Sequence, residues 1–250
     1  MTVLLLGGTA EARALAALLV DADVAVVSSL AGRVRRPRLP MGEVRVGGFG
    51  GVDGLADYLR EHSVDAVVDA THPFAAVISG NAHAACAATG TPLLRLERPG
   101  WDPVPGWNLV DDSAAAAALT ARLGSRPFLT VGRQGLDAYV EPLAEHAALV
   151  RVVDPPEIAL PASWTVLEDR GPYELDGERA LMLEHGADVL VTKDSGGRWT
   201  RAKLDAAADL GLPVVVVRRP PVPPGMLVVR TAVEAAAWVH ELAQPPRSPR

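Results

Sequence analysis

Short apolar runs and longer segments of helical character alternate from the first residues of the chain. The apolar run at 3–6 is followed by Gly-Gly-Thr, by a helix-like segment at 10–20 and by a second apolar run at 24–27. Continuous apolar runs of this length are typical of strands that are buried on both faces, whereas the longer segments are typical of helices. The order strand, loop, helix, strand predicts the opening unit of a nucleotide-binding domain.

The same alternation continues almost to the end of the chain. Further strands are predicted at 65–69, 92–96, 108–110, 128–131, 188–191, 213–217 and 227–229. Helices are predicted at 74–88, 113–123, 199–210 and 232–242. Strands that alternate with helices form parallel sheets with helices on both faces, so we expect an α/β protein.

Landmarks of the first half recur in the second half at a nearly constant distance. Asp65 and Asp188 each open an apolar strand and are 123 residues apart (188 minus 65). Gly7 and Gly132 each follow an apolar strand and are 125 residues apart (132 minus 7). Near-constant offsets of this kind indicate an internal duplication.

The duplication predicts two Rossmann-like, doubly wound domains with parallel sheets and a ligand cleft between them. The expected domains are an NADP-binding domain at 1–125 and a substrate-side domain at 126–250, with the boundary near 124–126. The Pro-rich segment 244–250 is expected to be disordered. Whether a strand crosses from one sheet to the other stays open at this point.

Composition narrows the class of protein. The chain has 250 residues, of which 49% are hydrophobic, and a net charge of −6. An acidic chain without a basic stripe is a poor candidate for nucleic-acid binding, and no apolar run is long enough for a signal peptide or a membrane span. The only cysteine, Cys86, is expected to be a core residue, a cytoplasmic location is expected, and no metal-ligand spacing is present.

The first glycine pair lies where a phosphate-binding loop belongs. Glycine lets backbone N–H groups approach a pyrophosphate, and the following helix N-terminus adds partial positive charge. The segment 7–12 reads Gly-Gly-Thr-Ala-Glu-Ala and departs from G-x-G-x-x-G. A tight structural turn is the alternative, and the candidate cofactor-binding residues are Gly7, Gly8, Thr9 and Glu11.

The end of the second strand favours NADP over NAD. An NAD-binding domain usually has an acidic residue here for the ribose hydroxyls, whereas this chain has Ser28 and Ser29, followed by Arg33. Hydroxyls and an arginine would accept a 2′-phosphate that a carboxylate would repel. A solvated basic loop is the alternative interpretation.

Two further loops follow strands at the edge where ligands bind in such sheets. In the first half, Ala70 and Thr71 are candidate cofactor contacts, and His72 is a candidate proton donor, cofactor contact or helix cap. In the second half, Lys193 is a candidate acid or carboxylate ligand, and Asp194 and Ser195 are either functional or caps of the next helix. We take His72, Lys193, Asp194 and Ser195 as the candidate catalytic residues.

Arginines near strand ends could converge on an anionic substrate, although each alone is more typical of a surface charge. The candidate substrate-binding residues are Arg98, Arg133, Arg170, Lys193, Gly196 and Arg218. The other lysine, Lys203, is expected on the solvated face of its helix.

Taken together, these segments resemble the precorrin-6A reductase family. The matching segments are LLLGGTAEAR at 4–13, DATHPF at 69–74, RLERPGW at 95–101, RGPY at 170–173, VTKDSGG at 191–197, KLDAA at 203–207 and GLPVVVVRRP at 211–220. The resemblance covers roughly residues 3 to 240. Asp194 stands where this family more usually has Asn, which adds a negative charge beside Lys193.

The resemblance implies NADPH-dependent reduction of a macrocycle double bond in precorrin-6A, or its cobalt form, to precorrin-6B in cobalamin biosynthesis. It implies a polycarboxylate tetrapyrrole substrate, and we expect a monomer or a weak homo-oligomer. The alternatives are an NADP-binding sensor, a two-domain glycosyltransferase or another NADP-dependent oxidoreductase. Short-chain dehydrogenases need Tyr-x-x-x-Lys, and none of the three tyrosines fits that pattern, namely Tyr58, Tyr139 and Tyr173.

Overall fold

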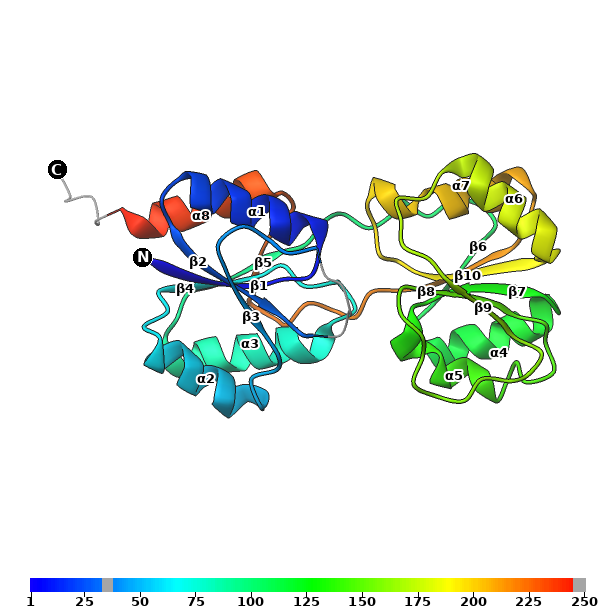
Figure 1. The fold of residues 1–250 in the computed structure, drawn as a ribbon, viewed down its shortest axis with the longest axis horizontal. Helices are drawn as coiled ribbons and strands as arrows, with labels where there is room; N and C mark the ends of the chain where they lie inside the picture. Colours follow the sequence, from blue (N-terminus) through cyan, green and yellow to red (C-terminus); the bar gives the residue numbers. More distant parts are fainter. Residues whose placement is uncertain (33–37, 245–250) are drawn as a thin grey trace. The chain divides into compact units, whose positions relative to one another are not determined.

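The computed structural model describes residues 1–32 and 38–244, and these residues form two compact units (Figure 1). Unit 1 consists of Met1–Pro99 together with the segment from Pro221 onward, and unit 2 consists of Gly100–Pro220. Arg33 and residues 245–250 of the predicted disordered tail lie outside the described ranges.

Unit 1 is a six-stranded parallel sheet in the order β12-β5-β4-β1-β2-β3. Its strands are β1 (Thr2–Leu6), β2 (Ala25–Leu30), β3 (Glu43–Val46), β4 (Ala66–Asp69), β5 (Leu93–Leu96) and β12 (Leu227–Val229). Helices α1 (Ala10–Asp21) and α8 (Ala232–Ala243) cover one face, and α2 (Gly51–Glu61) and α3 (Ala76–Thr89) cover the other (Figure 1). The central strand β1 is apolar on both faces, so Val3 and Leu5 pack into one core and Leu4 and Leu6 into the other.

Unit 2 repeats this arrangement in the order β6-β11-β10-β7-β8-β9. Its strands are β6 (Trp107–Val110), β7 (Pro127–Thr130), β8 (Leu149–Val152), β9 (Thr165–Glu168), β10 (Val189–Lys193) and β11 (Val214–Val217). Helices α4 (Ser113–Leu123) and α5 (Asp137–Val140) lie on one face, and α6 (Leu175–His185) and α7 (Ala202–Asp209) on the other (Figure 1). Two 3-10 turns, η1 (Arg133–Gly135) and η2 (Arg198–Thr200), precede α5 and α7.

The prediction of an α/β protein with two parallel-sheet, Rossmann-like domains is confirmed. The predicted boundary at 124–126 is wrong, because the two halves exchange their last strand. β6 follows β5 in the chain but joins unit 2, and β12 follows β11 but joins unit 1. Leu227 on β12 pairs with Leu94 on β5, and Trp107 on β6 pairs with Val214 on β11. The two exchanged strands are 120 residues apart (227 minus 107), and so are the two strands that accept them (214 minus 94). The ligand cleft between the domains stays a prediction.

The duplication is also visible at the amino ends of the two sheets. A carboxylate oxygen of Asp65 accepts a hydrogen bond from the Thr2 backbone N–H (2.6 Å). The Asp188 carboxylate accepts from the backbone N–H groups of Ser125 (2.6 Å) and Arg126 (2.9 Å). Equivalent aspartates thus accept hydrogen bonds from backbone N–H groups at the start of equivalent strands, β1 in unit 1 and β7 in unit 2.

Sequence patterns missed β3, α2, α5, β8, β9 and α6. β3 and β9 are edge strands with partly exposed side chains, and α2 contains glycines that weaken a helical pattern. None of the helices in the described ranges combines the length and apolar character that crossing a membrane requires.

Candidate functional site

The loop between β1 and α1 is open in the way a phosphate-binding loop requires. Gly8 has a φ of +112°, and apart from its chain neighbours no described residue has a heavy atom within 4 Å of the position that a Cβ would occupy there. The Thr9 side chain caps α1 by accepting from the Ala12 backbone N–H (3.1 Å). The residues predicted to approach a pyrophosphate therefore lie at the N-terminus of a twelve-residue helix.

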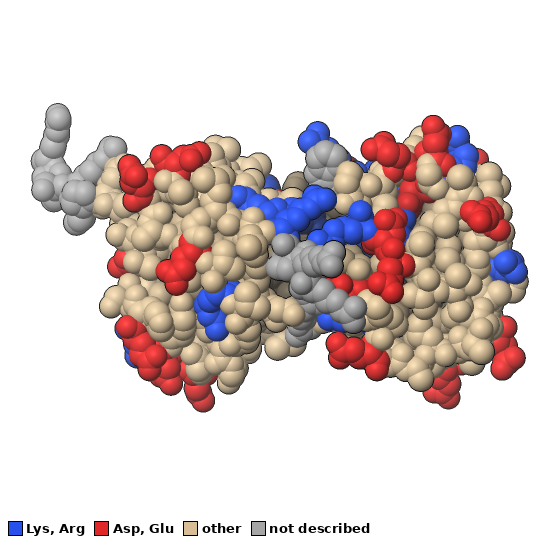
Figure 2. Space-filling model, viewed as in Figure 1, with Lys and Arg blue, Asp and Glu red and all other residues tan. Residues whose placement is uncertain are grey.

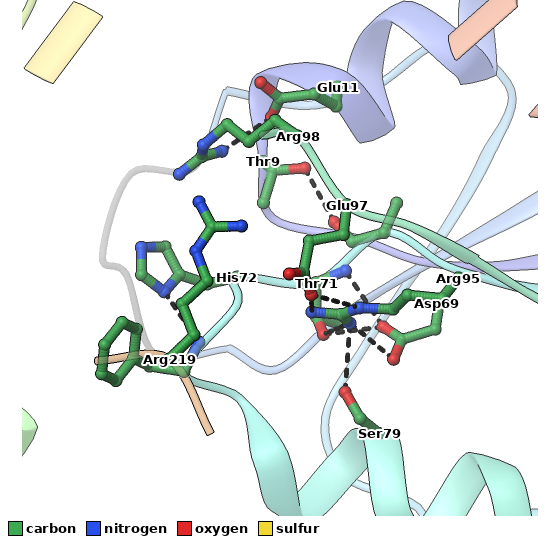
Figure 3. A network of polar contacts seen from close by, with 12 residues as sticks. Thr9, Glu11, Asp69, Thr71, His72, Ser79, Arg95, Glu97, Arg98 and Arg219 are labelled. Atoms are coloured by element: carbon green, nitrogen blue, oxygen red, sulfur yellow. Dashed lines mark hydrogen bonds and ion pairs between the residues drawn. The ribbon is translucent and has the colours of Figure 1, made fainter. Parts of the chain in front are cut away.

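Thr9 also joins this loop to the next candidate segment. Its hydroxyl donates to the Ala70 carbonyl (2.7 Å), a contact drawn in Figure 3. Ala70 and Thr71 directly follow β4, the strand beside β1. The predicted cofactor residues from two separate sequence segments thus lie together in unit 1.

A buried polar network holds the turn after β4 (Figure 3). Asp69 accepts from the Thr71 hydroxyl (2.7 Å) and forms an ion pair with Arg95 on β5 (2.6 Å). The Arg95 guanidinium also donates to Thr71 and to Ser79. Asp69 and Arg95 are 0% and 2% exposed, so their charges are compensated inside the protein rather than by water.

Arg95 has a second carboxylate partner. Its Nε and Nη2 atoms both donate to one oxygen of Glu97, at 3.0 and 2.9 Å. Sequence reasoning missed the roles of Asp69, Arg95 and Glu97, although Asp69 and Arg95 are register partners of β4 and β5. Only the pairing of the strands reveals that the two charges meet.

His72 lies in this turn and is partly exposed. Its Nδ1 accepts a hydrogen bond from the Phe74 backbone N–H (3.2 Å). A nitrogen that accepts this bond carries no proton, so the contact assigns the proton of the neutral ring to Nε2. Protonating Nδ1 would deprive the Phe74 N–H of its acceptor.

Glu11 and Arg98 form an ion pair (2.8 Å) beside the first loop (Figure 3). The pairing compensates an acidic side chain that would otherwise repel a phosphate. Arg98, predicted as a substrate ligand, is therefore in contact with the candidate cofactor loop.

The two serines at the end of β2 have different surroundings. Ser28 is 1% exposed, and its hydroxyl has no hydrogen-bond partner within the described part of the chain. The Ser29 hydroxyl accepts from Arg45 on β3 (2.8 Å). Since successive residues of a strand face opposite sides of the sheet, only Ser29 shares its side with Arg45.

In unit 2, Lys193 ends β10 with its amino group against Gly135. A Cβ at Gly135 would lie 2.9 Å from the Lys193 Nζ atom. Burial lowers the pKa of Lys193, and the nearby Asp137 carboxylate opposes that shift. The Lys193 amino group thus lies beside the loop of unit 2 that corresponds to the Gly-Gly-Thr loop of unit 1.

The three residues after Lys193 are held by hydrogen bonds and by an ion pair. Asp194 accepts from the Trp101 backbone N–H (3.1 Å) and lies 3.4 Å from the Arg219 Nε atom. The Ser195 hydroxyl lies 3.4 Å from the Thr200 hydroxyl, which donates to the Gly196 carbonyl (2.9 Å). Asp194 also lines a cavity of about 200 Å³, together with Trp101, Pro103, Trp107, Leu109, Val216, Arg218 and Arg219.

The remaining predicted substrate ligands also belong to unit 2. Arg133 donates to the Pro155 carbonyl and to Glu157, both at 3.3 Å. Arg218 pairs with the exposed Asp111 (2.6 Å), and Arg170 is exposed. The roles of these three arginines stay predictions. The visible face of each unit also carries groups of acidic side chains (Figure 2).

Lys203 corrects the sequence analysis. It is 4% exposed rather than on a solvated helix face, and its amino group donates to the Thr200 carbonyl (2.8 Å). Its Nζ lies 5.1 Å from the centre of a Trp101 ring. The hydrophobic pattern could not show this burial because the neighbouring contacts come from other segments.

Cys86 is buried as predicted, and burial raises the pKa of its thiol to about 12.

A second buried ion pair lies near Lys203. Both oxygens of Glu178 accept from the Arg151 guanidinium, which also lies 3.7 Å from the ring centre of Tyr173. Sequence reasoning did not single out this pair. Unit 2 therefore also has an Arg–carboxylate pair inside its sheet and helix layers.

Comparison with known proteins identifies relatives that match along almost the whole chain. The family model described as Precorrin-6x reductase CbiJ/CobK matches residues 2–240. The chain is 56% identical over 245 residues to a precorrin-6A reductase from Rhodococcus erythropolis, covering 97% of this chain and 98% of the relative. It is 32% identical over 259 residues to a cobalt-precorrin-6A reductase from Priestia megaterium, covering 98% and 100%.

A solved structure agrees with this result. The structure described as CobK precorrin-6A reductase is 41% identical, covers 99% of both chains and has a TM-score of 0.90.

Proposed function

This chain belongs to the precorrin-6x reductase family of cobalamin biosynthesis, and we propose that it reduces precorrin-6A or cobalt-precorrin-6A with NADPH. The observation that carries the choice of a nicotinamide cofactor is the open Gly8 position at the capped N-terminus of α1. The proposed product is the dihydro macrocycle precorrin-6B or its cobalt form.

The residues of unit 1 fit a dinucleotide. The backbone at Gly7 and Gly8 would bind the pyrophosphate, and Thr9 fixes the loop through Ala12 and Ala70. The Glu11 carboxylate is compensated by Arg98. When bound, NADPH supplies a hydride to the macrocycle, so the protein contributes binding, orientation and electrostatics.

The basic side chains of unit 2 suit the many carboxylates of the substrate. We assign Arg133, Arg170 and Arg218 to this role. Arg133 and Arg218 are each paired with an exposed carboxylate, Glu157 and Asp111. Exchange of such exposed partners for a substrate carboxylate costs little because surface ion pairs contribute little stability.

Reduction also needs a proton on the carbon next to the one that accepts the hydride. Lys193 suits this task because burial lowers its pKa and makes its proton easier to release. His72 is less suited as the acid, since its Nδ1 atom already accepts the Phe74 N–H. We therefore assign His72 to positioning within the turn and Lys193 to proton delivery.

Oxidation of NADPH by the purified protein in the presence of precorrin-6A tests the proposal, with NADH as the comparison. Loss of the near-ultraviolet absorbance of NADPH, together with a product two hydrogens heavier, is expected. If neither precorrin-6A nor its cobalt form is reduced while NADPH still binds, the chain is an NADP-binding sensor instead.

A further inference from the structure

Arg45 lies beside the part of the sheet where a dinucleotide's adenosine end belongs. It is on β3, the edge strand that pairs with β2, and it is the register partner of Ser29. Its Nη1 atom donates to the Ser29 hydroxyl (2.8 Å). The end of β2 is where these folds distinguish the two nicotinamide dinucleotides.

The Arg45 guanidinium carries a charge that no described carboxylate compensates through an ion pair. Its Nη1 and Nη2 atoms donate to the carbonyls of Gly47 and Gly48, each at 3.1 Å. The Cζ atom of Arg45 lies 3.8 Å from the centre of the Phe49 ring and 5.1 Å from the centre of the Tyr58 ring. All these partners are neutral, so they leave the positive charge of the guanidinium uncompensated.

Two of the five guanidinium N–H donors make no hydrogen bond to a described residue. Nη1 uses two hydrogens, on Ser29 and Gly47, and Nη2 uses one on Gly48, which leaves the Nε–H and one Nη2–H. Arginine binds phosphate best through two such donors. The bond from Nη2 to Gly48 is exposed, so an anion can reach this part of the side chain.

The loop after β3 leaves room for a ligand. Beyond the immediate chain neighbours, no heavy atom of the described residues lies within 4 Å of the Cβ position at Gly47, Gly48, Gly50 or Gly51. Only Phe49 interrupts these glycines, and its ring covers the guanidinium. The stacked ring and the two carbonyls fix the guanidinium before any ligand binds, which reduces the entropy lost on binding.

We propose that Arg45, fixed by Ser29 and the Gly47–Gly51 loop, binds the 2′-phosphate of the cofactor and makes the chain prefer NADPH to NADH. This inference rests on the proposed function, because it concerns the cofactor of the same reaction. It makes Arg45 a specificity-determining residue and gives Ser29 the role of holding it.

Calorimetric titration of wild type, Arg45→Gln and Arg45→Lys with NADPH and NADH tests the assignment. Loss of a charged hydrogen bond should weaken NADPH binding by roughly 10- to 100-fold in Arg45→Gln, with NADH affinity nearly unchanged. Arg45→Lys should lose less, because it keeps the charge but not the fork. Adenosine 2′,5′-bisphosphate and AMP should show the same contrast as the two dinucleotides.

Arg60→Gln is the matched control, since Arg60 lies on the neighbouring α2 but is exposed and pairs with Asp57 (2.9 Å). It should leave both affinities unchanged. If Arg45→Gln fails to fold, competition in the wild type replaces it: inorganic phosphate should weaken NADPH binding more than NADH binding.

An unchanged ratio of NADPH to NADH affinity in Arg45→Gln would overturn the inference, as would an equal loss of both. Equal loss would mean that Arg45 only holds the loop. A wild-type chain that binds neither dinucleotide would refute the proposed function itself, whereas a wild type that prefers NADPH beside an unchanged variant would refute only the role of Arg45.

Discussion

The loop after β1 in unit 1 and the loop after β7 in unit 2 occupy equivalent places in a duplicated fold, yet they differ in what they can bind. In unit 1, no described residue beyond the chain neighbours comes within 4 Å of the Cβ position at Gly8, and Thr9 caps a helix of twelve residues. In unit 2, the equivalent loop continues into the turn η1 and a helix of four residues, α5, and Gly135 lies against Lys193.

The difference shows how one fold can supply two kinds of anion site. A long helix with an open N-terminus suits a pyrophosphate, which needs several backbone N–H groups and the helix dipole. A short helix offers less of both, and a lysine with a compact charge suits a single carboxylate. The duplication thus supports cofactor binding in unit 1 and substrate binding in unit 2.

The largest effect is expected from breaking the buried charge pair of unit 1. Arg95→Met leaves Asp69 charged and buried, and should lower the free energy of unfolding by about 3–5 kcal/mol. Urea denaturation measures the loss. Arg60→Gln removes an exposed pair and should change stability by less than about 1 kcal/mol. Equal effects of the two substitutions would show that the Asp69–Arg95 network does not stabilise unit 1.

Valine at Gly8 and at Gly132 separates strain from cofactor binding. Both glycines have positive φ values, +112° and +74°, and no contact with the described residues at the Cβ position, so backbone strain should cost both variants about 1–3 kcal/mol of stability. Only Gly8→Val should weaken NADPH binding, by roughly tenfold or more, because its side chain would occupy the phosphate position. An equal loss of affinity in Gly132→Val would contradict the difference between the two loops.

A smaller effect is expected when Gly135 becomes alanine. The new methyl group would meet the Lys193 amino group at 2.9 Å, and the flexible lysine should move away at little cost in stability. Turnover should fall several-fold while NADPH affinity stays the same. Gly177→Ala, on α6 with free space around it, is the control. Unchanged turnover in Gly135→Ala would argue against a role for Lys193.

The smallest effect concerns the pH dependence of stability in unit 2. Burial lowers the pKa of Lys203 to about 7 from 10.5, and the positive charge of Arg151 adds to this shift. Between these values the unfolded chain binds the extra proton, so this group favours the folded state increasingly as the pH rises. The free energy of unfolding of wild type minus that of Lys203→Met should therefore increase from about pH 6 to about pH 9.

Chemical denaturation at several pH values measures that difference. Arg122→Met, an exposed position on α4, should show a difference that does not depend on pH. A flat or opposite trend for Lys203→Met would mean that the amino group stays charged when buried.

The sequence was sufficient to predict the layers of the fold but not how the chain divides between them. The apolar strands and the offsets between Asp65 and Asp188 indicated two similar parallel sheets, and the structure has them. The exchange of β6 and β12 was hidden, because the two strands occupy equivalent edge positions and their apolar patterns do not specify a sheet.

The candidate site was predictable where function depends on local sequence and not where it depends on pairing between strands. The Gly-Gly-Thr loop was found because one turn and one helix define it. Arg45 was missed because β3 is a short edge strand without a continuous apolar run, and its importance comes from Ser29 on the neighbouring strand. The Asp69–Arg95 pair needed the register of β4 and β5.

Hydrogen–deuterium exchange of the intact protein with and without NADPH tests most directly whether the two equivalent loops have different ligands. We predict slower exchange on NADPH binding at residues 7–13 and 45–51 in unit 1. Protection confined to residues 131–136, with none at 7–13, would contradict the assignment of the cofactor to unit 1.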